Sequence, residues 1–277
     1  MILGLIEHDR GKLNDLSLEM VTFGRRLAQQ FGQPFQAVLI GEAARPLADR
    51  LPEYGVSVAH LAQHERLDDY APEAWAQCVV DLIGTLNATL VLAPGTDRGS
   101  EVLAHVAARA NLPLAANCTA VQSLEPLTVT RTRWGGSLLE DARVNGEVKL
   151  LTIAPHCLHA EAAPTAEALS LQMFRPNLND KHFRVRVSQR VEPGAGTISL
   201  ADAKVVVGGG RGVGSAEGFK TLEELAGLLG GAVGCSRAVT SLGWRAHADQ
   251  VGQTGTRIAP EIYIACGVSG AIQHMVG

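Results

Sequence analysis

Hydrophobic residues at the start of the chain recur with two different spacings. Residues 2–7 are mostly apolar and predict a β-strand. The segment that follows places Leu16, Met20, Phe23 and Leu27 three or four residues apart, which is the spacing of one face of an α-helix. A strand followed by a helix therefore opens the chain.

The same alternation of strands and helices continues to residue 110. Apolar runs predict further strands at 37–40, 56–58 and 89–93, and a polar loop at 94–100 follows the last of them. The two helices between and after these strands have apolar faces formed by Trp75, Val79, Leu82 and Leu86 and by Val102, Leu103, Val106 and Ala110. Strands that alternate with helices form mostly parallel sheets covered on both faces, and we predict such a sheet here.

Between residues 115 and 153 the rhythm changes to short alternating segments. In residues 128–133, threonine alternates with valine or arginine. The pair Asn145-Gly146 is flanked by alternating segments, which is a hairpin signal. We predict an antiparallel extension of the first sheet.

A stretch rich in turn-forming residues, 188–200, predicts a linker. It divides the chain into an N-terminal α/β domain, residues 1–187, and a second α/β domain, residues 201–277. A new strand at 204–207 opens the second domain.

The second domain begins with a strand, a glycine-rich turn at 208–215 and a helix. This order favours a phosphate or nucleotide site. No register of the turn gives G-x-G-x-x-G, however, and the next strand, 232–235, is followed by Ser236 and Arg237, where a nicotinamide site would have a carboxylate. A structural tight turn is the alternative interpretation.

Polar residues follow the later strands of this domain in a similar way. The loop 249–255 carries amides, a hydroxyl and glycines, and Ser269 after the last strand can cap a helix that begins at Gly270. The carboxyl ends of parallel strands meet at one edge of a sheet. We therefore predict that Arg237, Thr254 and Ser269 converge on one crevice.

Composition narrows the classes of function. The chain has 277 residues and a formal net charge of −4, so it is no polycation for nucleic acid. Its 46% hydrophobic and 19% charged residues are ordinary for a soluble protein with a sizeable core. It lacks a run of about 20 apolar residues and a basic signal segment, which predicts a cytoplasmic protein without membrane insertion.

The cysteines, histidines and carboxylates give no pattern typical of catalysis or metal binding. The five cysteines are far apart without a C-x-x-C pair, which predicts reduced thiols. His156, Cys157 and His159 lie together but have no second group at a metal-binding spacing, so we expect no metal. No Ser-His-Asp or paired-carboxylate arrangement is recognisable.

Five segments of the second domain, in this order, resemble the α subunit of electron-transfer flavoproteins. They are VVVGGGRGVG (205–214), CSRA (235–238), GW (243–244), QVGQTG (250–255) and APEIYIACGVSGAIQH (259–274). The segment APGTDRGSEVLAHVAARANLPLAANCTAV of the first domain resembles the family more loosely. The resemblance implies an N-terminal nucleotide-hydrolase-like α/β domain and a Rossmann-like α/β domain that binds FAD. It also implies a heterodimer whose β subunit carries AMP.

The same resemblance implies which residues contact FAD. Arg237 would stabilise negative charge on the flavin as it is reduced, and His274 would lie near the flavin N1 and C2 carbonyl. Thr254 and Gln253 would hydrogen-bond the ring edges, and the helix start at Ser269 would receive phosphate or ribityl oxygens. The full implied set is Arg211, Ser236, Arg237, Val251, Gly252, Gln253, Thr254, Ser269, Gly270, Ala271, Ile272, Gln273 and His274.

The implied function is that of an electron carrier, without net substrate turnover. Its FAD would accept electrons from flavin dehydrogenases, such as the acyl-CoA dehydrogenases of fatty acid β-oxidation, and pass them to a quinone-linked oxidoreductase. Two alternatives remain open at this point. One is a nicotinamide-dependent oxidoreductase, and the other is a non-redox nucleotide-binding module.

The chain departs from the family pattern in three places. It ends at Gly277, where the family continues through another strand and the segments that hold the AMP half of FAD. We therefore expect either a fragment of a longer product or a subunit with weakened flavin affinity. Ser241 replaces an acid before Gly-Trp, and Thr256-Arg257 replace a lysine after QVGQTG.

Overall fold

The computed structural model describes residues 1–165, 168–189, 198–201 and 203–277. The chain forms two compact units, one of residues 1–133 and 138–189 and one of residues 134–137 and 190–277. The predicted linker, 188–200, lies largely outside the described residues, so its boundaries remain a prediction.

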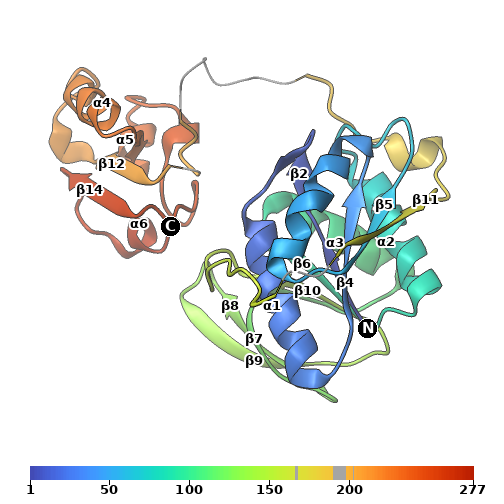
Figure 1. Cartoon of the computed structure of the whole chain (residues 1–277). Helices are drawn as coiled ribbons and strands as arrows, with labels where there is room; N and C mark the ends of the chain where they lie inside the picture. Colours follow the sequence, from blue (N-terminus) through green and yellow to red (C-terminus); the bar gives the residue numbers. More distant parts are fainter. Residues whose placement is uncertain (166–167, 190–197, 202) are drawn as a thin grey trace. The chain divides into compact units, whose positions relative to one another are not determined.

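The first unit contains a nine-stranded sheet with the order β11-β5-β4-β1-β6-β10-β7-β8-β9 (Figure 1). Its strands are β1 (Ile2–Leu5), β4 (Phe35–Ile40), β5 (Val58–Ala62), β6 (Leu90–Pro94), β7 (Leu114–Leu124), β8 (Leu127–Arg133), β9 (Leu138–Val144), β10 (Lys149–Ile153) and β11 (Ser170–Phe174). The strands from β11 to β7 are parallel, while β7, β8 and β9 pair antiparallel. The predicted α/β class with an antiparallel extension is thus confirmed.

Helices cover both faces of this sheet because neighbouring strand residues point to opposite sides. In β1, Ile2 packs into one core cluster and Leu3 into the other. The first cluster includes residues of α1 (Leu16–Phe31) and of the 3-10 helix η1 (Glu42–Tyr54), and the second includes residues of α2 (Pro72–Leu86) and α3 (Asp97–Ala110). The remaining elements are the short strands β2 (His8–Asp9) and β3 (Lys12–Leu13), which pair antiparallel, and the 3-10 helix η2 (Asp180–Phe183).

Local sequence signals set the helix ends in this unit. α1 ends at Gly32 in the left-handed conformation, with φ 63°, which glycine adopts without steric cost. Pro72 occupies the first turn of α2, where its missing N–H is not needed. The Thr96 hydroxyl caps α3 by accepting a hydrogen bond of 2.9 Å from the Gly99 N–H.

Two details of the first sheet differ from the sequence predictions. The third strand does not occupy 56–58 but begins at Val58 and runs to Ala62. The hairpin prediction at Asn145-Gly146 is wrong, because β10 lies between β6 and β7 and pairs parallel with both. The local turn signal is overridden by burial, since Leu150 and Leu151 are fully buried in the sheet centre.

The second unit contains a three-stranded parallel sheet with the order β13-β12-β14. Its elements are β12 (Val205–Gly209), η3 (Arg211–Val213), α4 (Phe219–Leu228), β13 (Ala232–Cys235), α5 (Arg237–Ser241), η4 (His247–Asp249), β14 (Ile262–Cys266) and α6 (Ile272–Met275). A core of Val207, Phe219, Leu222, Cys235 and Val239 joins α4 and α5 to the sheet.

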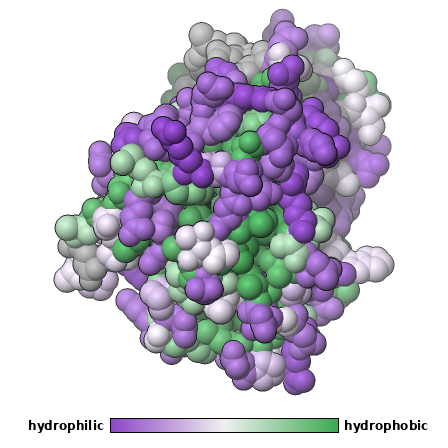
Figure 2. Space-filling view, turned by 90° about the vertical axis from the view of Figure 1, so that its right-hand side faces the viewer, coloured by the Kyte–Doolittle hydropathy of each residue, from purple (hydrophilic) through white to green (hydrophobic). Residues whose placement is uncertain are grey.

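The exposed surface mixes residue classes. Figure 2 shows hydrophilic residues over most of one face, with hydrophobic residues emerging between them. Among the residues that the structure describes, no helix is both long and apolar enough to cross a membrane.

Candidate functional site

The glycine-rich turn after β12 packs tightly against β14 and the loop that follows it. A Cβ on Gly208 would lie 1.8 Å from the Tyr263 hydroxyl oxygen, and one on Gly210 would lie 2.1 Å from the Gly267 carbonyl oxygen. The Gly210 and Gly212 N–H groups donate to the carbonyls of Cys266 and Gly267, at 2.8 and 2.9 Å. These glycines are therefore needed for close backbone packing.

A pocket lies beyond the carboxyl ends of β13 and β14. Its lining residues come from three segments, namely the loop after β13 with the start of α5, the loop before β14, and the loop after β14 with α6. They are Ser236, Arg237, Ala238, Gln250, Val251, Gly252, Thr254, Val268, Ser269, Gly270, Ala271, Gln273 and His274. Ten of the thirteen residues implied by the resemblance are among them. Arg211, Gln253 and Ile272 are exposed and do not line the pocket.

The first loop places a positive charge at the pocket. The Ser236 N–H donates to the Gly209 carbonyl at 2.9 Å, which ties the loop to the end of β12. The Arg237 side chain is exposed and makes no hydrogen bond or ion pair within the described ranges. Its guanidinium donors are therefore available to a ligand that carries negative charge.

The second loop is held by a buried amide. Gln250 is 2% exposed, its Oε1 accepts from the Thr240 hydroxyl at 2.7 Å, and its Nε2 donates to Thr254 Oγ1 at 2.9 Å. Because the Thr254 oxygen already accepts this bond, its O–H remains free to donate into the pocket. Gly252, with φ 129°, allows close contact with the Gln273 carbonyl.

The third loop differs from its prediction. The predictions that Ser269 caps a helix and that this helix begins at Gly270 are wrong. The helix α6 begins at Ile272, has Ala271 as its N-cap and contains only four residues. Gly270 has φ 71°, a conformation outside the right-handed helical region. Ser269 is exposed and still lines the pocket.

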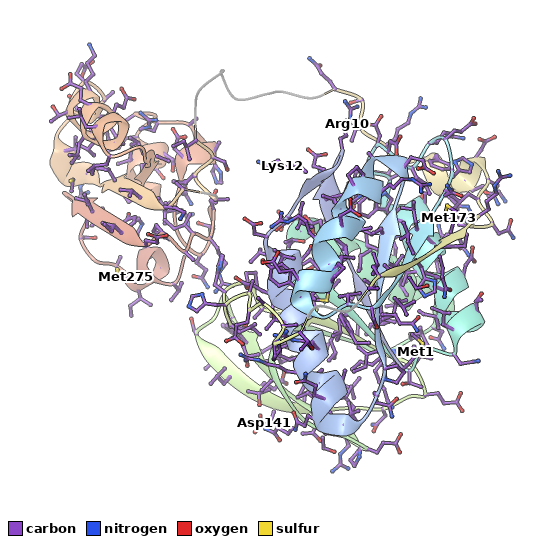
Figure 3. The ribbon with its side chains drawn as sticks, in the orientation of Figure 1. Met1, Arg10, Lys12, Asp141, Met173 and Met275 are labelled. Carbon is purple, nitrogen blue, oxygen red and sulfur yellow. The ribbon has the colours of Figure 1, made fainter. Side chains whose placement is uncertain are left out.

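His274 is the most unusual polar residue of the pocket. Its side chain is 8% exposed, and its Nε2 lies 2.6 Å from the Tyr263 hydroxyl. The other ring nitrogen, Nδ1, is buried and has no hydrogen-bond partner among the residues that the structure describes. Met275, the next residue, is 71% exposed and points away from the fold (Figure 3).

Sequence reasoning did not assign a role to two residues that organise this site. Gln250 begins the QVGQTG segment but was not included among the implied ligands, although it anchors the loop through Thr254. Tyr263 lies within β14, and nothing in the strand pattern distinguishes it from a core residue. Only its distance to His274 reveals the contact.

Comparisons with known proteins identify the family of the chain. Residues 2–176 match the family described as "Electron transfer flavoprotein domain", and residues 199–277 match "Electron transfer flavoprotein FAD-binding domain". The chain is 34% identical to the electron transfer flavoprotein subunit alpha of Megasphaera elsdenii, over 99% of this chain and 82% of that protein. The chain belongs to the electron transfer flavoprotein α-subunit family.

Other relatives support the same assignment. The electron transfer flavoprotein subunit alpha of Thermoanaerobacterium thermosaccharolyticum is 31% identical over 98% of this chain and 83% of its own length. The protein FixB of Clostridium saccharobutylicum is 34% identical over 98% of this chain and 82% of its own length. The family resemblance found in the sequence is thereby confirmed, and FAD is the cofactor of the C-terminal domain of this electron transfer flavoprotein α subunit.

The polar groups of the pocket fit a flavin. An isoalloxazine ring presents carbonyl oxygens and ring nitrogens at its edge and gains electrons on reduction. The Arg237 guanidinium and the Thr254 O–H offer a cation and a neutral donor for such an edge, and His274 adds a pocket-lining imidazole whose Nδ1 has no partner among the described residues. The pocket encloses only about 80 Å³, whereas ligand pockets commonly reach about 300–1,000 Å³, so this unit encloses only part of a dinucleotide.

Proposed function

We propose that this electron transfer flavoprotein α subunit works in a heterodimer as a carrier between flavin enzymes. Its electrons would come from flavin dehydrogenases, such as acyl-CoA dehydrogenases, and go to a quinone-linked oxidoreductase. No substrate is converted on the chain itself. Bound FAD supplies the redox chemistry, since its ring accepts and returns electrons.

The observation that carries this proposal is the unpaired polar groups in the pocket. A buried polar atom without a partner costs free energy, and His274 Nδ1 is such an atom. Arg237 adds a cation that no acidic group of the described chain neutralises. Both groups gain partners when an electron-accepting ring binds, and the cation stabilises the ring more strongly once it is reduced.

The partial enclosure of the pocket supports a second subunit. Because the pocket of about 80 Å³ holds only part of a flavin, another surface is needed to exclude water from the rest. We assign this role to an electron transfer flavoprotein β subunit, which would carry AMP. The relatives are themselves named as alpha subunits.

A cytoplasmic location is part of the proposal. All five cysteines are free, and a reducing compartment keeps thiols in this state. Burial raises the pKa of the Cys118 thiol to about 12, so this thiol is protonated and unreactive at neutral pH.

The decisive experiment purifies the chain together with its β subunit and follows the visible flavin spectrum. We expect one FAD per αβ pair, and bleaching of the flavin bands when an acyl-CoA dehydrogenase and its substrate are added. A folded heterodimer that stays colourless with added FAD would contradict the proposal. Binding of a nicotinamide dinucleotide without flavin would favour the oxidoreductase alternative, although the glycine turn where it would bind is packed against Gly267.

A further inference from the structure

The two ring nitrogens of His274 have different surroundings. Nε2 lies 2.6 Å from the Tyr263 hydroxyl oxygen, and Nδ1 has no partner among the described residues. His274 lines the pocket, whereas Tyr263 does not. Nδ1 is therefore the ring nitrogen without a partner in the described part of the fold, on a residue that lines the pocket.

The hydrogen bond between the two side chains has two possible directions. If Nε2–H donates to the phenol oxygen, the phenol hydrogen has no acceptor, because the Tyr263 hydroxyl makes no other hydrogen bond in the described part of the chain. If the phenol donates to Nε2, its hydrogen is used and Nδ1 carries the ring proton. The second direction leaves only the Nδ1–H donor unsatisfied, and this donor belongs to a residue that lines the pocket.

Two features favour the Tyr263 phenol as the hydrogen-bond donor to His274. Burial raises the pKa of Tyr263 to about 12, so it retains the hydrogen it donates at neutral pH. Gly208 lies against the hydroxyl end of Tyr263, since a Cβ there would be 1.8 Å from the hydroxyl oxygen. The first glycine of the turn therefore makes room for the phenol.

We propose that Tyr263 is a positioning residue that fixes His274 as its Nδ1–H tautomer, so that the imidazole donates a hydrogen bond to the flavin. The assignment rests on the proposed FAD role of the pocket. Tyr263 itself does not reach the ligand. It acts through the bond to Nε2, and Gly208 belongs to the same arrangement because it leaves space for the phenol.

The first test needs no substitution. Histidine-selective nitrogen-15 labelling of the flavin-free heterodimer, with His274→Asn to assign the signal, reports which ring nitrogen carries the proton. We expect Nδ1–H in the natural chain and a shift toward Nε2–H in Tyr263→Phe. A natural chain with the proton on Nε2 would overturn the assignment, whatever the variant does.

The second test measures FAD affinity in both redox states. One neutral hydrogen bond corresponds to about a tenfold change in affinity at most, and we expect Tyr263→Phe to weaken binding of reduced FAD up to about tenfold more than binding of oxidised FAD. For a two-electron couple this lowers the reduction potential by up to ~30 mV. Equal weakening of both forms would mean a merely structural role and would overturn the proposal.

A matched control is available in the first unit. Tyr70 donates from its hydroxyl to the Glu101 carboxylate at 2.8 Å, so Tyr70→Phe also removes a tyrosine hydrogen bond, at a position far from the pocket in sequence. It should leave the potential unchanged, and a shift as large as that of Tyr263→Phe would count against the assignment. Failure of the natural heterodimer to bind FAD would reject the proposed function, while the tautomer measurement still judges Tyr263 separately.

Discussion

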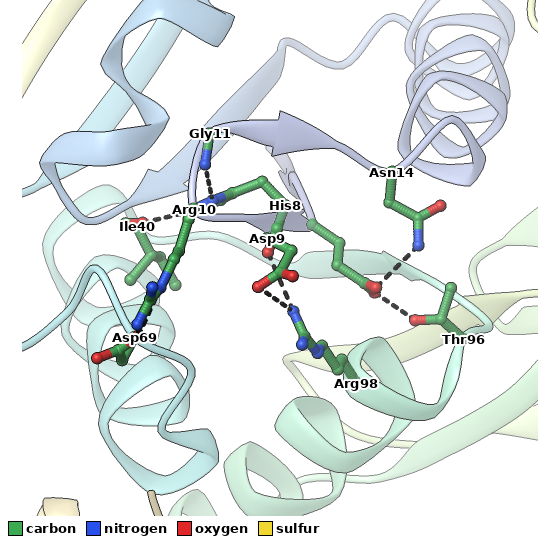
Figure 4. A network of polar contacts seen from close by, with 10 residues as sticks. His8, Asp9, Arg10, Gly11, Asn14, Ile40, Asp69, Thr96 and Arg98 are labelled. Atoms are coloured by element: carbon green, nitrogen blue, oxygen red, sulfur yellow. Dashed lines mark hydrogen bonds and ion pairs between the residues drawn. The ribbon is translucent and has the colours of Figure 1, made fainter. Parts of the chain in front are cut away.

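The two units both place polar loops at the carboxyl edge of a parallel sheet. The protein's own side chains close the edge after β1 in the first unit, whereas the pocket of the second unit is lined in part by groups that have no partner in the described part of the chain. In the first unit, Glu7 follows β1 and is 6% exposed. Its carboxylate accepts from Asn14 Nδ2 at 2.9 Å and from the Thr96 hydroxyl (Figure 4). In the second unit, Arg237 and His274 Nδ1 have no partners among the described residues.

The closed edge lies where a ligand binds in many open sheets. β4 and β6 flank β1 on opposite sides, which makes this the point where the direction of winding reverses. A helix N-terminus favours negative charge, and the Glu7 carboxylate is bonded to Thr96, the N-cap of α3. An internal carboxylate thus occupies the position that an anionic ligand would take.

Two buried histidines, one in each unit, differ in their hydrogen bonding in the same way. His8 is 1% exposed, its Nε2 lies 2.7 Å from the Ile40 carbonyl, and its Nδ1 accepts from the Gly11 N–H at 3.2 Å. Both nitrogens are therefore satisfied by the neutral ring. His274 has one satisfied nitrogen and one open nitrogen. The carboxyl edge of a parallel sheet can therefore be filled by the protein's own side chains, as at Glu7 and His8, or can leave groups that line a pocket without partners in the described chain, as at His274.

Removing the cation of the open edge should have the largest effect. We expect Arg237→Ala to weaken FAD binding about 10- to 100-fold, because a charged hydrogen-bond donor is lost, and to lower the reduction potential. Equilibrium dialysis and redox titration of the heterodimer measure both. Lys220→Ala, which removes an exposed cation of α4 outside the pocket, is the control. Equal effects of the two variants would show that the net charge of the chain, and not the position of Arg237, determines FAD affinity and the reduction potential.

Disrupting the hydrogen bonds of Glu7 should lower the stability of the first unit and leave FAD binding unchanged. Glu7→Gln turns one acceptor of Asn14 and Thr96 into a donor, and we expect the free energy of unfolding to fall by about 1–3 kcal/mol. Chemical denaturation measures this change, and FAD affinity should stay constant. Glu161→Gln removes an exposed carboxylate paired with Arg26 and should have a smaller effect. A loss of FAD binding in Glu7→Gln would contradict the comparison.

The smallest expected effect is a pH dependence that comes from His8. Burial lowers its pKa, Arg98 acts in the same direction, and the Ile40 carbonyl, Asp9 and Asp68 oppose it. The unfolded chain therefore binds more protons, so the contribution of His8 is complete above the ordinary pKa of about 6.5. It declines as pH falls below that value toward the folded pKa, by at most about 1.4 kcal/mol per pH unit.

Denaturation at several pH values between 5 and 8 tests this prediction. The stability of His8→Gln should fall less steeply with acid than that of the natural chain, while His159→Gln, at an exposed position of the same unit, should retain the natural slope. An unchanged slope in His8→Gln would assign the pH dependence to other groups.

Much of the fold follows from local patterns in the sequence. The helices α1, α2 and α3 were predictable because residues such as Met20 and Trp75 repeat at helical spacing on a face that becomes buried. The position of β10 was not, because pairing between β6 and β7 depends on contacts that no neighbouring residue encodes. A two-residue turn signal at Asn145 could not compete with burial of the whole strand.

The candidate site was predictable to a similar extent and for a similar reason. That Arg237, Thr254 and Ser269 meet in one pocket follows from the common edge of parallel strands. The bond between Tyr263 and His274 does not, since it depends on the distance between a strand and a short helix.

The central place of β10 also has a consequence for the order of folding. β1 and β6 can pair once residue 94 has left the ribosome, but the bonds on the other side of β6 come from residues 149–153. The segment that forms β7, β8 and β9 separates β6 from β10 in sequence. Pairing between strands that are far apart in sequence is slow. During synthesis, the hydrogen-bonding edge of β6 with which β10 pairs stays unpaired until more than fifty further residues, between Pro94 and Lys149, and β10 itself have left the ribosome.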